Sequence, residues 1–255
     1  MDKILTAINH ASLISPDKLA LHGHDGRYTY AQLQEESDKV VCCLLKEGLK
    51  TGNKVACLFS PGTKKTITFL GALKAGITFV NISLDLPTST IQELLKNLNV
   101  IAIIGPSDLP DYGPKQIFPD RIKNCNKSSS YNTQSNEIAV VTFSSGTTGL
   151  PKAIPISRAN LVSRSKTLDH DYIEFGKNTL HFTQFWAHRI LRVFTEGHTL
   201  FIYDPKAQGI SGIASFLVKY KITLMVSFIA LFREIESNDD IVLNDLQAVV
   251  ILGER

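Results

Sequence analysis

The sequence predicts an α/β protein built from layered αβα sheets. Short apolar strands alternate with amphipathic helices along most of the chain, and one apolar run leads directly into a loop rich in Ser, Gly and Thr. Such alternation is typical of helices that cross over between parallel strands of one sheet. With 255 residues, of which 44% are hydrophobic and 20% charged, the chain can bury a large core.

The first predicted helix covers residues 29–48. Thr29 and Gln32 have the spacing of a capping box, apolar residues recur at helical intervals after them, and Gly48 suits the C-terminal stop. The alternation then continues through five elements. These are strands at 54–59, 78–82 and 100–105, and helices at 63–75 and 87–98.

Residues 106–136 interrupt this alternation. They are rich in Pro, Asp, Ser and Asn and show little periodicity, so they are predicted to form a long surface connection. Approximate lobes of 1–175 and 176–255 are expected, the second one incomplete. The elements predicted after the connection are strands at 138–143, 200–203, 223–226 and 248–252, and helices at 157–169, 210–220 and 230–236.

Composition excludes several classes of function. The net charge is +3, and the 27 Lys and Arg residues are dispersed, so no nucleic-acid partner is expected. The four cysteines lack metal-ligand spacing, which argues against zinc and against a disulfide framework. The strongest apolar run, residues 222–232, is shorter than the ~20 residues that a membrane span needs. A cytoplasmic protein with reduced thiols is expected.

The loop after the strand at 138–143 is the strongest functional signal. Glycines allow a polyphosphate to approach the backbone, hydroxyls surround them, and a lysine adds positive charge at the far end. A buried strand that ends on such a loop is typical of a ligand site at the carboxyl edge of a sheet. The predicted phosphate-binding residues are Ser144, Ser145, Gly146, Thr147, Thr148, Gly149 and Lys152.

Two other interpretations of this loop are less well supported by its residues. A Walker P-loop needs Gly-Lys-Ser/Thr in succession at the start of a helix, whereas Pro151 precedes Lys152 here, so that interpretation fails. A flexible turn with a solvated lysine is the common outcome for such composition. The ordered string directly after a buried strand favours phosphate binding instead.

The string Phe143-Ser-Ser-Gly-Thr-Thr-Gly-Leu-Pro-Lys152 resembles the signature of the adenylate-forming superfamily. That superfamily comprises acyl-CoA synthetases, adenylation domains of nonribosomal peptide synthetases, and luciferases. The resemblance covers nearly the whole chain in the order of the family's motifs. It includes Tyr28-Thr-Tyr-Ala-Gln-Leu33, Gly52-Asn-Lys-Val-Ala56, Leu70-Gly-Ala-Leu-Lys-Ala-Gly76, Asn160-Leu161, Lys221-Ile-Thr223 and Leu252-Gly253-Glu254.

The resemblance implies the N-terminal domain of such an enzyme and a two-step reaction. A carboxylic acid attacks the α-phosphate of ATP, with Mg²⁺, and releases pyrophosphate; a thiol of coenzyme A or of a phosphopantetheine carrier protein then captures the acyl-adenylate. Later motifs of the family are missing before Arg255: the magnesium-binding Glu, the ribose-binding Asp and the C-terminal lid domain with its lysine. A truncated domain is therefore expected to adenylate poorly or not at all, and a second polypeptide that completes the domain is a candidate partner.

Some positions depart from the family pattern or bear on the substrate. The family usually has Gly at the position of Ala153, His at Arg158 and Gly at Leu252. Each of these changes is expected to narrow the space near the nucleotide or substrate. No acidic residue occurs at 183–189 to pair with an amino-acid ammonium. The predicted substrate-pocket residues are Trp186, His188, Gly253 and Glu254.

Each aromatic candidate has a plainer alternative: core packing for Trp186, and a surface or hydrogen-bonded position for His188.

For the whole chain, three hypotheses remain. The first is part of an ATP-dependent carboxylate-activating ligase. The second is a non-catalytic ATP- or AMP-binding module or degenerate remnant. The third, an unrelated nucleotide-binding protein, is disfavoured because several motifs match in order. Sequence does not separate the first two, nor does it specify the acid or the acceptor.

Overall fold

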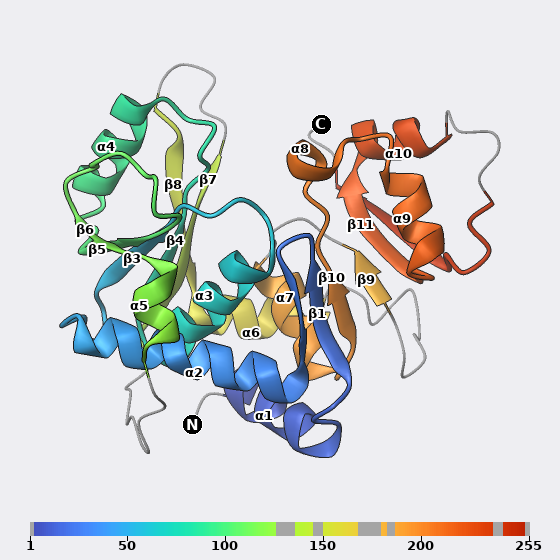
Figure 1. Cartoon of the computed structure of the whole chain (residues 1–255), viewed down its shortest axis with the longest axis horizontal. Coiled ribbons are helices and arrows are strands. Elements are labelled where there is room, and N and C mark those ends of the chain that lie inside the picture. Colours follow the sequence, from blue (N-terminus) through green and yellow to red (C-terminus); the bar gives the residue numbers. More distant parts are fainter. Residues whose placement is uncertain are drawn as a thin grey trace.

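A computed structural model describes residues 3–125, 136–144, 150–167, 180–182, 187–236 and 242–252. Their strands form two sheets that lie side by side (Figure 1). The first sheet has the order β12 (Ala248–Leu252), β11 (Leu224–Phe228), β9 (Leu180–Phe182), β10 (Thr199–Phe201), β1 (Leu19–Gly23) and β2 (Gly26–Thr29). The second has the order β6 (Lys115–Ile117), β5 (Ala102–Ile104), β3 (Lys54–Cys57), β4 (Thr78–Asn81), β7 (Ile138–Ser144) and β8 (Lys152–Ser157).

Most neighbouring strands are parallel, as the alternation of strands and helices predicts. The exceptions are two antiparallel pairs at sheet edges, β1 with β2 and β7 with β8. The central strands are buried on both faces: β3, β5 and the middle of β7 contain residues with almost no exposed surface. Such strands show continuous apolar runs, and this explains why the sequence revealed them.

The helices cover the sheets on both sides. In Figure 1, α3, α6 and α7 lie between the two sheets, and α4 and α9 lie on the outside of the second and first sheet, respectively. The helices are α1 (Lys3–Ile14), α2 (Tyr30–Lys46), α3 (Thr63–Lys74), α4 (Thr88–Asn97), α5 (Pro119–Lys123), α6 (Arg158–Thr167), α7 (Ala187–Thr195), α8 (Pro205–Gln208), α9 (Ile213–Lys219) and α10 (Ile229–Glu236).

Helix α2 begins where the sequence predicts. The Thr29 hydroxyl accepts a hydrogen bond from the backbone N–H of Gln32 at 3.3 Å, and the Gln32 side chain accepts one from the N–H of Thr29 at 2.9 Å. The capping box is therefore confirmed. The strands predicted around 54–59, 78–82 and 100–105 and the helices around 63–75 and 87–98 are confirmed within a few residues.

The prediction that residues 106–136 form a long surface connection was wrong in part. Strand β6 pairs in parallel with β5, and α5 follows it with Pro119 in its first turn. Only Ile117 of β6 is buried, so a three-residue strand stabilised by backbone pairing leaves almost no pattern in the sequence. The lobe boundary near residue 175 stays a prediction, and β1 and β2 pair into the sheet that otherwise contains strands after residue 179.

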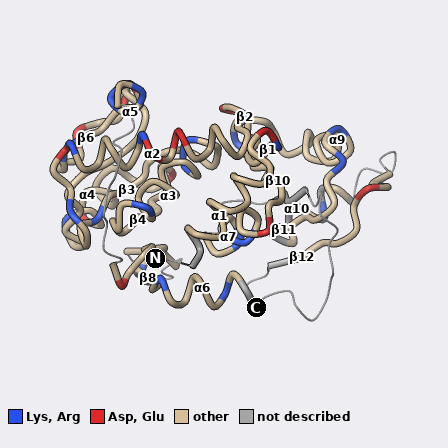
Figure 2. The backbone as a smooth tube through the Cα atoms, turned by 90° about the horizontal axis from the view of Figure 1, so that it is seen from below, with Lys and Arg blue, Asp and Glu red and all other residues tan. Residues whose placement is uncertain are grey.

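Charged side chains are spread over the molecule. Figure 2 shows Lys and Arg interspersed with Asp and Glu along the described backbone, which agrees with the dispersed charges of the sequence. Across the described ranges, no helix combines the length and apolar character needed to cross a bilayer.

Candidate phosphate-binding site

The predicted phosphate loop is held at both ends by the antiparallel pair β7–β8. Ser144, the last residue of β7, lies opposite Lys152, the first residue of β8, in the strand register. Beside them, Phe143 pairs with Ala153. The loop between the strands therefore begins at a hydroxyl and returns to a lysine directly across from it. Ser145, Gly146, Thr147, Thr148 and Gly149 lie outside the described residues.

Burial of β7 fixes where this loop leaves the sheet. Ala139, Val140 and Val141 are at most 3% exposed, and β7 is flanked by β4 on one side and β8 on the other. Ser144 is half-buried, whereas Lys152 is exposed and forms no ion pair with any other described residue. A hydroxyl and an ammonium that no described acidic group neutralises, at the two ends of one loop, suit an anionic ligand.

A buried amine lies near the same edge of the sheet. Val80 of β4 pairs with Val141 of β7, so Asn81 lies at the carboxyl end of the strand beside the loop-bearing one. The ammonium of Lys65, in the first turn of α3, donates to the side-chain oxygen of Asn81 at 3.1 Å, and Lys65 is only 5% exposed.

The charge state of Lys65 reflects its position. Burial lowers the pKa of Lys65, because the ammonium loses its water, and nearby Cys57, Asp204 and Asp85 partly oppose the shift. Sequence analysis missed Lys65 and Asn81. Their spacing carries no motif, and only the pairing of β4 with β7 brings them toward the loop.

Of the four predicted substrate-pocket residues, the structure describes His188. His188 lies in the first turn of α7 and is 8% exposed, so it is not a surface histidine. Its role in a pocket stays a prediction. Trp186, Gly253 and Glu254 lie outside the described residues.

Arg158 has a structural position that the sequence did not indicate. Its backbone N–H donates to the carbonyl of Glu137 at 2.8 Å, and its guanidinium donates to the carbonyl of Leu73, near the end of α3, at 2.7 Å. The side chain is buried and satisfies a carbonyl in the last turn of a helix, as basic side chains often do. Arg158 therefore joins α6 to α3. Ala153 is exposed on the edge strand β8.

A metal site cannot be built from the described residues. Among them, no three or more His, Cys, Asp or Glu side chains converge as ligands. The described residues therefore offer no preformed ligand cage for Mg²⁺, an ion that commonly binds through substrate phosphates and one or two carboxylates.

Comparison with known proteins resolves the family. The model of the AMP-binding enzyme family matches residues 9–255. The chain belongs to the AMP-binding enzyme family. Pyochelin synthetase PchF of Pseudomonas aeruginosa is 27% identical over 152 residues, which are 58% of this chain and 8% of that protein. The D-alanine–D-alanyl carrier protein ligase of Bacillus cereus is 26% identical over 179 residues, 67% of this chain and 36% of that ligase.

Solved structures share the fold of this chain. O-succinylbenzoate coenzyme A synthetase of Bacillus subtilis, in complex with AMP, superimposes with a TM-score of 0.84 at 13% identity, over 97% of this chain and 67% of that one. The N-terminal subdomain of Klebsiella oxytoca NpsA gives 0.83 at 21% identity, over 98% of this chain and 67% of that one. The predicted fold of an adenylate-forming N-terminal domain is confirmed, and the chain spans only part of these relatives.

Proposed function

We propose that this chain supplies the phosphate-binding part of an ATP-dependent carboxylate-activating enzyme. The observation that supports the proposal is the register of β7 and β8, which sets Ser144 and Lys152 across from each other at the two ends of the Ser/Gly/Thr loop. The family model covers both strands and the loop between them.

In this reaction the protein binds and offsets charge. A carboxylate oxygen of the substrate bonds to the α-phosphorus of ATP, the bond from that phosphorus to the bridging oxygen breaks, and pyrophosphate leaves with the electron pair. Lys152 offsets the negative charge on the departing phosphates, and Ser144 and the other loop hydroxyls donate hydrogen bonds to them. Mg²⁺ bound to the nucleotide phosphates would neutralise part of their charge. No side chain of the protein acts as a nucleophile.

The acid and the acceptor belong to the proposal as well. His188 and Trp186, with Gly253 and Glu254, are proposed to face the acid. The acceptor is a thiol, either of coenzyme A or of a phosphopantetheine carrier protein. The names of two relatives, a coenzyme A synthetase and a carrier protein ligase, support these two acceptors equally.

Binding of ATP to Lys152 variants tests the proposal. Titration calorimetry on the wild-type chain should show saturable binding of ATP, and Lys152→Ala should weaken it about tenfold or more, because a charge-assisted contact to phosphate is lost. Raising the salt concentration should weaken wild-type binding more than it weakens binding by the variant.

Lys123→Ala is the matched control, since Lys123 is also an exposed lysine but lies in α5. It should leave the affinity unchanged. If the wild-type chain bound no ATP, or if both variants bound it as tightly as the wild type, the assignment of the loop would be wrong. Exchange of pyrophosphate into ATP, measured on the same samples, separates adenylation from binding alone.

A further inference from the structure

A cavity of about 590 Å³ opens beside the turn between β1 and β2, on the first sheet. It is lined by residues of that turn, by Tyr203 after β10, and by α9 with Tyr220 at its end. Ser144, Lys152 and His188, the predicted site residues that the structure describes, do not line it. Its volume lies within the range of small-molecule sites, about 300–1,000 Å³.

Aromatic rings form the wall of this cavity. His22 stacks on buried Phe201 with ring centroids 5.2 Å apart, and Tyr220 lies 4.6 Å from His22. Phe216 of α9 lies 4.6 Å from Tyr220 and 5.0 Å from Tyr203. These spacings are typical of packed aromatic pairs, so the wall presents ring faces and edges to any occupant.

The shape of the cavity is fixed at Tyr203 and Gly212. The Tyr203 hydroxyl donates to the carbonyl of Gly209 at 2.6 Å, and burial raises the pKa of this phenol. A Cβ at Gly212 would lie 2.6 Å from the same hydroxyl, closer than atoms approach without a shift. A glycine is therefore required where α9 begins, and it leaves room beside the ring.

Positive charge borders the aromatic wall. Arg27 and Lys219 line the cavity, both are exposed, and neither pairs with an acidic group of the described chain. Among the residues that the structure describes, no Asp or Glu lines the cavity. Asp25 lies in the turn between β1 and β2, but its carboxylate accepts hydrogen bonds from the N–H groups of Thr63 and Lys64 at the start of α3.

Burial and the two cations affect the pKa of His22, which also lines the cavity. Burial lowers the pKa of His22, and the positive charges of Arg27 and Lys219 lower it further. Both cations therefore act on the same part of the cavity. An anion placed between them would be attracted by two charges that the described chain leaves unneutralised.

We propose that this cavity binds a small aromatic anion, a planar ring that carries a carboxylate or a phosphate. The ring packs against Phe216, Tyr220 and His22, and the anionic group lies between Arg27 and Lys219. Lys219 lies over the Tyr220 ring at 5.1 Å, but a neutral ligand would leave both cations without an acidic partner among the described residues. An anion without a ring would leave the aromatic wall uncovered. The site does not include Ser144 or Lys152, the two described ends of the phosphate loop.

Salicylate is the probe for an aryl carboxylate. Benzyl alcohol supplies a ring without the negative charge, and acetate supplies the carboxylate without a ring. Ligand-observed NMR should show saturable binding of salicylate, and both separate probes should bind about tenfold more weakly or worse. The double variant Arg27→Gln/Lys219→Gln should weaken salicylate binding about tenfold. Because both side chains are exposed, this variant should retain the wild-type circular dichroism spectrum.

The matched control is Lys96→Gln/Lys123→Gln, which makes the same change in charge at exposed lysines away from the cavity. It should bind salicylate as the wild type does, and so should Lys152→Ala, which affects only the proposed ATP site. If AMP displaces salicylate, the natural ligand belongs to the nucleoside phosphates. If AMP does not displace it, the natural ligand is an aryl carboxylate. Absence of saturable salicylate binding, or equal loss in the two double variants, would overturn the proposal.

Discussion

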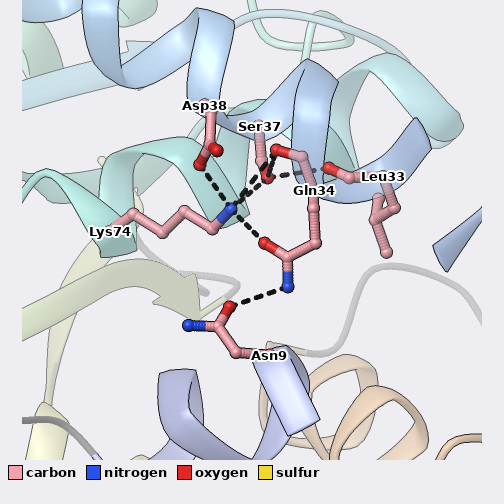
Figure 3. A network of polar contacts seen from close by, with 6 residues as sticks. All are labelled: Asn9, Leu33, Gln34, Ser37, Asp38 and Lys74. Atoms are coloured by element: carbon pink, nitrogen blue, oxygen red, sulfur yellow. Dashed lines mark hydrogen bonds and ion pairs between the residues drawn. The ribbon is translucent and has the colours of Figure 1, made fainter. Parts of the chain in front are cut away.

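At the scale of single residues, Lys74 carries a buried positive charge between two helices. Its ammonium lies 2.8 Å from the carboxylate of Asp38 and 2.7 Å from the hydroxyl of Ser37, and it also contacts Gln34, which in turn bonds to Asn9 (Figure 3). The side chains of Lys74 and Asp38 are 8% and 9% exposed. Such a pair is stable only while every member of the network is present.

Gly71 lets α3 approach α2 closely enough for this network. A Cβ at Gly71 would lie 2.5 Å from the side chain of Val40, so no larger residue fits between the helices without a shift. Lys74 lies three residues further along α3, on the same face. The close packing of the two helices excludes water from the ion pair, which increases both its strength and the cost of leaving it incomplete.

Removal of one partner of this pair should be more damaging than removal of both. Asp38→Ala should lower the free energy of unfolding by about 3 kcal/mol, because it leaves the Lys74 ammonium buried without its counter-charge. Asp38→Leu combined with Lys74→Met should cost less than Asp38→Ala alone. Urea unfolding at neutral pH measures both. If the double variant were the less stable one, the ion pair would be a net source of stability.

At the scale of elements, the sequence predicts where both α2 and α3 begin, but it reveals the capping residues of α2 alone. The capping residues of α2 are three positions apart, so a local pattern reveals them. Helix α3 begins after Gly62, and its first N–H groups are satisfied by Asp25, 38 residues earlier. The Asp25 carboxylate accepts from Thr63 at 2.7 Å and from Lys64 at 3.1 Å.

This remote cap leads to a prediction about α3. Asp25→Ala should lower the free energy of unfolding by about 1–2 kcal/mol, because two N–H groups of the helix lose their acceptor. Asp25→Asn keeps one acceptor oxygen and should lose less than half of that amount. Urea unfolding of the two variants measures the difference. Equal losses would indicate that the negative charge at the helix N-terminus matters more than the hydrogen bonds.

Other elements escaped prediction for a shared reason. Strand β8 is exposed over most of its length and contains Pro155, so it shows neither an apolar run nor alternation, and its pairing with β7 defines it. Strands β1 and β2 were likewise not predicted, because their pairing with each other and the pairing of β1 with β10 define them. In the candidate site, the loop was recognised from its own residues, whereas Lys65 and Asn81 come near it only through the pairing of strands.

At the scale of the whole molecule, contacts between distant segments hold the N-terminal hairpin in place. Strand β1 pairs in parallel with β10, and the hydroxyl of buried Tyr30 donates to the carbonyl of His198 at 2.7 Å, across 168 positions of sequence. Residues of both sheets, together with α2, α3 and α7, belong to one continuous apolar core. No local pattern encodes such contacts, so the arrangement of the sheets was beyond sequence reasoning.

The burial of His198 at this junction makes global stability depend on pH. Burial lowers the pKa of His198 from 6.5 to about 4, and the positive charges of Lys18 and Arg192 contribute to the shift. Glu196, whose carboxylate lies 3.3 Å from the imidazole, does not reverse it. Between these two values the unfolded chain binds a proton at His198 that the folded chain does not. Acid therefore favours the unfolded state in this window, and the contribution of His198 is fully present above it.

The free energy of unfolding should consequently fall by on the order of 2 kcal/mol on going from about pH 7.5 to about pH 4.5 through this residue alone. His198→Gln keeps the backbone carbonyl that accepts from Tyr30 and removes the titrating ring. Urea unfolding across this range should thus show a shallower loss in the variant than in the wild type, with the two curves converging toward acid pH. Parallel curves would mean that His198 is protonated as readily in the folded chain as in the unfolded one, and that the imidazole at the junction is reached by water.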